Sequence, residues 1–355
     1  MYSKELESIK KSNRFRTREL FDDNLIDLAS NDYLGLSTNK TLFQNAYETL
    51  LKDNYHSPKA SMLVNGYSKI HKKFEDRLCE VNDFEAGVIV GSGFLANISM
   101  IEALCRKNDT LFIDEEYHAS GILATKLLKP EQVIVFNHND FKDLEKKISA
   151  NQRTGRNIIA IEGVYSMGGD LAPIEIFQIA DEKKAILIVD EAHSFGVIGD
   201  NLLGIFDYYK IKPTPYHVKM GTLGKAYGSY GAYILASKQI IDFLTNRAKP
   251  IIYSTAPSLF DTALANESLD YIIENKDLLK EKIKNNLTII KNILGLNSQS
   301  LIIPILIGDN KKVKKIQENL KQNGFLAGAI RQPTVKEAII RLIAKIDINE
   351  NDLTK

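Results

Sequence analysis

The sequence contains little cysteine, no excess of either charge and no long apolar run. Its two cysteines, Cys79 and Cys105, lie in apolar helical patterns without a second cysteine or a histidine at metal-ligand spacing. This pattern predicts core thiols in a reducing compartment and no metal centre. Lysine and arginine number 46 against 45 aspartates and glutamates, which gives a formal net charge of +1. Such a chain has no bulk field to attract nucleic acid or an anionic membrane.

The apolar residues are also too scattered for a membrane protein. A membrane-spanning helix needs about 18 consecutive apolar residues, and no stretch of the sequence is that long. The N-terminus also lacks the apolar core of a signal peptide. Residues 1–20 instead predict an amphipathic helix rich in Lys and Arg. We therefore expect a cytoplasmic protein whose partners are neither membranes nor nucleic acids.

From residue 40 onwards, helical patterns alternate with short, almost entirely apolar segments. These segments are predicted strands at 86–90, 110–114, 132–136, 157–162 and 185–189. Continuous apolar strands between helices indicate a mostly parallel sheet covered on both faces, which is a doubly wound α/β fold. After residue 236 the pattern changes to long helices and a few strands. We expect an N-terminal arm (1–40), a large α/β domain (41–236) and a smaller C-terminal α+β domain (237–355).

Polar or glycine-rich loops follow several of these strands. Open α/β sheets bind ligands at the carboxyl ends of their strands, so these loops are expected to converge there. The turn at 91–94 precedes a helix whose N-terminus could hold a phosphate, although it is not a dinucleotide-binding motif. Three further loops carry the remaining candidate side chains, which are His118, Asp190, His193 and Lys225.

This set of residue types suits pyridoxal 5′-phosphate (PLP). In PLP enzymes a lysine forms a Schiff base with the cofactor, and a carboxylate pairs with its pyridinium nitrogen. Lys225 would then need a pKa below the usual value of about 10.4 in order to act as a base. Each fragment alone is common in unrelated proteins, so the prediction depends on their combination.

Six segments in order along the chain carry a family resemblance. They are SNDYLGL (30–36), GSGFLAN (91–97), EGVYSMGGD (162–170), DEAH (190–193), TLGK (222–225) and IYST (252–255). Together they strongly resemble the α-oxoamine synthases, which are fold-type I PLP-dependent transferases, over residues 5–345. The resemblance implies the α/β fold with its smaller C-terminal domain, PLP as cofactor and a homodimer.

The resemblance also implies roles for single residues at the cofactor. Lys225 would be the Schiff-base lysine and proton carrier, and His118 would stack on the ring. Asp190 would pair with the ring nitrogen, and His193 would hydrogen-bond the phenolic oxygen. Ser166 would support that oxygen or the imine. The residues implied at or near the phosphate are Gly93, Phe94, Thr222 and, from the neighbouring subunit, Thr255 together with Ser254.

Substrate contacts follow from the same resemblance. Arg331 lies in a segment similar to the family's Arg-Pro-Pro-Thr-Val motif and would bind the carboxylate of the amino acid. Either Arg14 or Arg16 would contact the substrate from the N-terminal arm. The segment 337–343 departs from the family pattern by losing a glycine and one of two arginines.

Within the family, the chain is most similar to the members that condense L-alanine with a pimeloyl thioester and release CO2. The acyl donor would be pimeloyl-CoA or a pimeloyl-carrier protein. The alternatives are glycine C-acetyltransferase, the aminolevulinate and sphingoid-base synthases, a PLP aminotransferase or lyase, and a PLP-binding scaffold without turnover. A scaffold is disfavoured because no basic patch or DNA-binding motif accompanies the domain.

Overall fold

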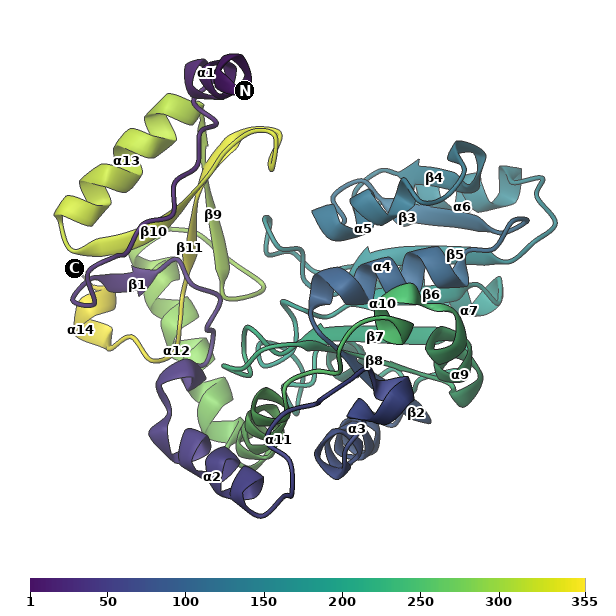
Figure 1. Cartoon of the computed structure of the whole chain (residues 1–355). Coiled ribbons are helices and arrows are strands. Elements are labelled where there is room, and N and C mark those ends of the chain that lie inside the picture. Colours follow the sequence, from purple (N-terminus) through teal and green to yellow (C-terminus); the bar gives the residue numbers. More distant parts are fainter. Residues whose placement is uncertain (355) are drawn as a thin grey trace.

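The computed structural model describes residues 1–354, and two separate β-sheets organise it (Figure 1). The larger sheet has seven strands, in the spatial order β2 (Ala86–Val90), β8 (Ala232–Ala236), β7 (His217–Thr222), β6 (Ile186–Asp190), β5 (Asn157–Glu162), β3 (Thr110–Asp114) and β4 (Val133–Phe136). All neighbouring pairs from β7 to β4 are parallel, and β8 runs antiparallel to both of its neighbours. The strands predicted from the apolar segments are therefore confirmed.

Helices cover both faces of the larger sheet. They are α3 (Lys69–Asn82), α4 (Gly93–Leu104), α5 (Ala119–Thr125), α6 (Phe141–Ala150), α7 (Ile174–Glu182), α8 (Ile205–Tyr209), α9 (Lys238–Arg247) and α10 (Lys249–Ile252). Successive strand residues point to opposite faces, so Phe112 belongs to one core cluster while Leu111 and Ile113 belong to another. Burial on both faces explains why these strands read as continuous apolar runs. The predicted α/β fold class is confirmed.

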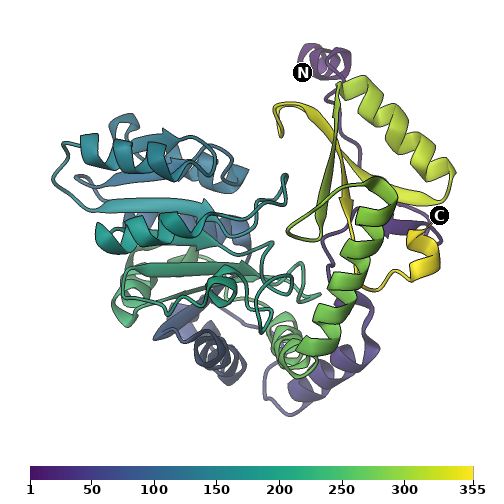
Figure 2. The same cartoon turned by 180° about the vertical axis from the view of Figure 1, so that it is seen from behind.

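The smaller sheet has four strands, in the order β1 (Ile26–Leu28), β10 (Phe325–Ile330), β11 (Ala338–Ile343) and β9 (Ile302–Gly308). Its helices are α12 (Lys276–Leu294), α13 (Asn310–Gln322) and α14 (Glu350–Leu353), while α2 (Lys40–Leu51) packs against α11 (Leu259–Glu274). Figure 2 shows α12, in light green, running beside this sheet and facing the larger one. No helix among residues 1–354 is long and apolar enough to cross a membrane.

The N-terminal arm differs from expectation. Helix α1 covers only Ser3–Lys11, not residues 1–20, and none of its side chains is buried. A helix that packs against no other element is only marginally stable, so it stays short. Asn13 follows it with a φ of 54°, a left-handed conformation that cannot continue a right-handed helix. Further along, β1 pairs in parallel with β10. The arm thus contributes a strand to the smaller sheet, and the domain boundaries stay a prediction.

A buried ion pair anchors the loop that follows β6. Lys219 and Glu191 are 1% and 0% exposed, and their Nζ and Oε1 atoms lie 3.5 Å apart. The ammonium group also donates to the Leu203 carbonyl and to Asn82 Oδ1, while the backbone N–H of Ile205 donates to the Glu191 carboxylate at 2.8 Å. Every charge in this cluster has partners, which a buried charge requires.

We expect Lys219→Met to lower the free energy of unfolding by about 3–5 kcal/mol, because it leaves the Glu191 charge buried without its cation. The measurement is unfolding in increasing urea, and the free energy is taken from the first unfolding transition. Lys72→Met removes one member of an exposed pair with Asp76 and serves as the control, with little change expected. Equal losses in the two variants would contradict the role given to the buried pair.

Candidate active site

A cavity of about 200 Å³ lies where β5, β6 and β7 end and α4 begins. Its lining joins residues far apart in the sequence, namely Gly93, Phe94, Asn97, His118, Glu162, Asp190, Ala192, His193, Met220, Thr222 and Lys225. This is the carboxyl edge of the parallel strands, where α/β proteins bind ligands.

Lys225 stands on a tight turn between β7 and β8. The turn is closed by the backbone N–H of Gly228, which donates to the Lys225 carbonyl at 2.9 Å. Gly228 has a φ of 60°, and a Cβ there would lie 2.6 Å from the Ser37 nitrogen, so only glycine fits. The turn brings the Lys225 amine to 2.7 Å from His193 Nε2.

The surroundings of Lys225 favour the neutral amine. Burial lowers its pKa to about 8, and the Arg341 charge adds to this, whereas the carboxylates of Asp190 and Glu162 oppose it. A substantial fraction of the amine is therefore unprotonated at mildly alkaline pH. A lysine in this state can act as a nucleophile and as a base.

Asp190 is held by an amide of fixed orientation. Asn97 Oδ1 accepts a hydrogen bond from the Tyr117 hydroxyl at 2.6 Å, which turns Nδ2 towards Asp190 Oδ2 at 2.9 Å. The backbone N–H of Ala192 donates to the other carboxylate oxygen at 3.0 Å. Asp190 is only 4% exposed, so these donors stabilise a charged carboxylate inside the protein.

The same network reaches His118. Asn97 Nδ2 also donates to Ser120 Oγ at 3.0 Å, and Ser120 Oγ lies 2.7 Å from His118 Nδ1. Because Ser120 Oγ accepts from Asn97, its own proton points to His118 Nδ1. Desolvation and the Lys225 charge lower the pKa of His118, against the opposing effect of Asp190. His118 is therefore a neutral ring at the wall of the cavity.

The part of the cavity at the start of α4 suits a phosphate. Helix α4 begins at Gly93, and the side chain of its N-cap residue Ser92 accepts from the Leu95 N–H. The unpaired N–H groups of the first turn and the helix dipole attract an anion. Thr222 faces this turn, since a Cβ on Gly93 would lie 3.7 Å from its Cβ atom.

These groups fit PLP by their chemistry. A carboxylate, a helix N-terminus and a partly neutral lysine in one cavity match the needs of the ring nitrogen, the phosphate and the aldehyde carbon. The buried Oε1 atom of Glu162, which has no hydrogen-bond partner within the described chain, also faces this space. Unmet polar atoms at a cavity wall are typical of a ligand site.

Comparisons with known proteins agree with this geometry. Residues 23–353 match the class I and II aminotransferase family. Two 8-amino-7-oxononanoate synthases from Helicobacter pylori strains are 49% and 50% identical over 343 residues, which is 96% of this chain and 92% of each relative. The chain belongs to the class I and II aminotransferase family. The recognition of a PLP-dependent transferase from the sequence motifs is thereby confirmed.

Solved structures of this family share the fold. A serine palmitoyltransferase from S. paucimobilis superposes with a TM-score of 0.88 at 20% identity, covering 99% of this chain and 94% of the other. An 8-amino-7-oxononanoate synthase from Francisella tularensis gives 0.78 at 25% identity, with 94% and 95% covered.

Most of the predicted cofactor residues of this family member meet at the cavity. The structure brings together Gly93, Phe94, His118, Asp190, His193, Thr222 and Lys225. Ser166 lies just behind the wall, where its N–H donates to Glu162 at 3.0 Å. Ser254 and Thr255 follow α10, outside the lining, and Thr255 is exposed. The roles given to all of these residues, including Ser166, Ser254 and Thr255, stay predictions.

The arginines predicted to bind substrate lie apart from this cavity. Arg331 Nη1 donates to the Asn13 carbonyl at 2.7 Å, and Arg16 donates to Thr334 at 3.2 Å. Arg14 is exposed on the same arm. These contacts fasten the N-terminal arm to the β10–β11 connection, and the substrate roles of the three arginines stay predictions.

Sequence reasoning missed a buried arginine. Arg341 on β11 is 5% exposed, donates to the Ser166 carbonyl at 2.7 Å and to Asn31 Oδ1 at 3.0 Å, and keeps Nη2 without a partner among residues 1–354. The only signal was its position within an apolar strand, where a charged residue is rare. Asn97 was also missed, although it lies within a recognised motif.

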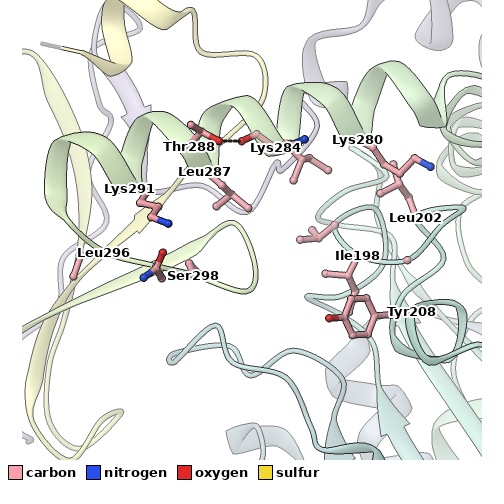
Figure 3. A pocket seen from close by; sticks show the side chains of 14 residues that line it. Ile198, Leu202, Tyr208, Lys280, Lys284, Leu287, Thr288, Lys291, Leu296 and Ser298 are labelled. Carbon is pink, nitrogen blue, oxygen red and sulfur yellow. Dashed lines mark hydrogen bonds between the residues drawn. The ribbon is translucent and has the colours of Figure 1, made fainter.

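A larger cavity, of about 360 Å³, lies between α12 and the loop after β6 (Figure 3). Its walls are mainly apolar, and its cations are Lys280, Lys284 and Lys291 on α12. Lys284 and Lys291 are exposed, and Lys280 donates to the Asp200 carbonyl. None of the candidate PLP residues lines this cavity, so its size does not make it the catalytic centre.

The lowered pKa of Lys225 predicts its reactivity in the cofactor-free protein. We expect the rate of acetylation of Lys225 by acetic anhydride to rise with a midpoint near pH 8, because only the neutral amine reacts. Mass spectrometry of the Lys225 peptide over a range of pH measures this midpoint. A midpoint near the usual lysine value of about 10.4 would contradict the electrostatic description of the site.

Proposed function

We propose that this chain is an 8-amino-7-oxononanoate synthase of biotin biosynthesis. It condenses L-alanine with pimeloyl-CoA or a pimeloyl-carrier protein, and it releases CO2 and the free thiol. The names and identities of the Helicobacter pylori relatives support this reaction. The observation that carries the proposal is the convergence of Lys225, His193 and the braced Asp190 on one cavity.

PLP, when bound, supplies an electron sink for the negative charge that develops at the α-carbon of the amino acid. Asp190, whose carboxylate is fixed by Asn97, would pair with the ring nitrogen and favour its protonated form. Helix α4 holds the phosphate through its first N–H groups. Both contacts orient the cofactor, and orientation accounts for a large part of catalysis.

Lys225 has two tasks in this reaction. It would bind the cofactor covalently, and its amine would take up or return the proton at the α-carbon of the amino acid. Its pKa of about 8 suits both, since the amine can lose and regain a proton near neutrality. The hydrogen bond with His193 keeps the amine at the cavity wall between these steps.

Arg341 is the group that we propose for the carboxylate of alanine. Its Nη2 atom is buried without a partner, and its charge acts on both Lys225 and His193. A guanidinium with a free N–H binds a carboxylate strongly in such surroundings. Burial lowers the pKa of Arg331, and the nearby charge of Arg16 lowers it further. The sequence resemblance predicted that Arg331 binds this same carboxylate and that Arg14 or Arg16 contacts the substrate, and those roles stay predictions.

Mass spectrometry of the products tests the reaction. With PLP, L-alanine and pimeloyl-CoA, we expect 8-amino-7-oxononanoate and free CoA, while Lys225→Ala loses turnover and the exposed Lys238→Ala keeps it. A pimeloyl-carrier protein is the parallel donor. Reaction with glycine alone would indicate another α-oxoamine synthase, and keto acid formation without a thioester would indicate an aminotransferase. Either result would overturn the proposed substrates.

A homodimer is part of this proposal. Large apolar side chains are exposed on α4, on the turn that carries Lys225 and on segments next to α10. We call Val64 (77%), Phe94 (45%), Tyr230 (63%) and Tyr253 (79%) the apolar patch. They come from neighbouring segments, since α10 contacts both α4 and the turn Met62–Gly66. Exposed apolar surface of this kind marks a protein interface. Thr255 lies two residues from Tyr253, where it could reach the phosphate of a partner.

We expect Val64→Glu to shift the protein from dimer to monomer in sedimentation velocity, because a charge on the apolar patch must be desolvated on association. Leu306→Glu is the matched control, since Leu306 is 64% exposed on β9 and outside the patch. A dimer that persists in the Val64 variant and dissociates in the Leu306 variant would place the interface elsewhere. The free thiols of Cys79 and Cys105 support the proposed cytoplasmic location.

A further inference from the structure

Three side chains form a hydrogen-bonded line behind the reactive amine. Tyr33 is 0% exposed, and its hydroxyl lies 2.5 Å from His193 Nδ1. The other ring nitrogen of His193, Nε2, lies 2.7 Å from Lys225 Nζ. Tyr33 belongs to the segment between β1 and α2, so it reaches the site from a part of the chain that does not line the cavity.

The surroundings of Tyr33 decide which way its proton points. The Arg341 guanidinium lies near this hydroxyl and offers it no acceptor. The remaining acceptor, Asn31 Oδ1, is 3.4 Å away and already accepts from Arg341 Nη1 at 3.0 Å. Burial raises the pKa of Tyr33, so the hydroxyl keeps its proton. That proton is therefore donated to His193 Nδ1.

His193 has a single ring proton to place. Burial lowers the pKa of its imidazole well below the usual value, and the charges of Lys225 and Arg341 lower it further. A neutral imidazole that accepts at Nδ1 carries its proton at Nε2. The Nε2–H group then faces Lys225.

We propose that Tyr33 is a positioning residue that holds His193 in the Nε2–H tautomer, so that the imidazole presents a hydrogen-bond donor to Lys225 and to the cofactor oxygen beside it. The inference rests on the proposed function, because it concerns the same site. A donor at Nε2 stabilises the neutral amine of Lys225, whereas the other tautomer would accept from the ammonium form. The same donor suits an anionic phenolic oxygen.

Tyr33 also joins this site to the smaller sheet. Arg341 extends from β11, and the backbone N–H of Ile346 donates to the Tyr33 carbonyl at 3.1 Å. The groups that act on Lys225 from the larger sheet are Asp190 and Glu162, which oppose the effect of Arg341 on its pKa. Tyr33 acts on Lys225 in a different way, through the tautomer of His193.

The direct test is the tautomer itself. In protein labelled with 15N at its six histidines, NMR resolves protonated from unprotonated ring nitrogens, and the His193→Gln variant assigns the His193 signals. We expect a proton on Nε2 and none on Nδ1, both without and with PLP. A proton on Nδ1 in the wild-type protein would overturn the inference, and this measurement needs neither a substrate nor a Tyr33 variant.

Tyr33→Phe provides the second measurement. Without its phenol, His193 can shift its proton to Nδ1 and accept from the ammonium of Lys225, so we expect the acetylation midpoint of Lys225 to rise by about one pH unit. The absorbance of bound PLP should change its pH midpoint as well. Tyr227→Phe is the matched control, since Tyr227 is 0% exposed and has no hydrogen bond to His193 within residues 1–354.

If the acetylation midpoint of Lys225 is the same in the Tyr33→Phe and Tyr227→Phe variants, the inference is wrong. Failure of the proposed function is recognised separately, because it would show as loss of the condensation product with the His193 tautomer and the Lys225 midpoint unchanged.

Discussion

The contact between Lys225 and His193 is the interaction on which the site depends. It joins a lysine on the turn after β7 to a histidine on the loop after β6, and neither side chain could hold this position alone. The buried ion pair of Glu191 and Lys219 fixes this loop. The turn is fixed by Gly228, which approaches the backbone at Ser37 too closely for any side chain.

Burial and charge act together at this contact. A lysine amine enclosed by protein favours its neutral form, and the Arg341 guanidinium strengthens that preference. The two nearby carboxylates limit the effect, so the pKa stays close to physiological pH. The site therefore combines the hydrogen-bonded carboxylate of Asp190 with a partly neutral base, Lys225, within one small cavity.

Much of this was predictable from the sequence. The buried strands were identified because apolar residues on both faces leave continuous runs, and the motifs at their ends named Asp190, His193 and Lys225. The N-terminal helix was predicted too long, because periodicity does not show that α1 lacks packing partners.

The contacts that cross between distant segments had no sequence signal. Arg341 meets Asn31 across 310 positions, and Tyr33 meets His193 across 160. No local pattern encodes such pairs, since their position follows from how the smaller sheet packs against the larger one. Asn97, on α4, was hidden for a similar reason, because its partner Asp190 lies 93 positions away at the end of β6.

The most direct test of the account is to map the cofactor to its lysine. PLP-loaded protein is reduced with borohydride, digested and examined by mass spectrometry. The account predicts one phosphopyridoxyl group per chain, located on Lys225. A group on another lysine, or no attached group after loading, would contradict the assignment of this cavity as the catalytic centre.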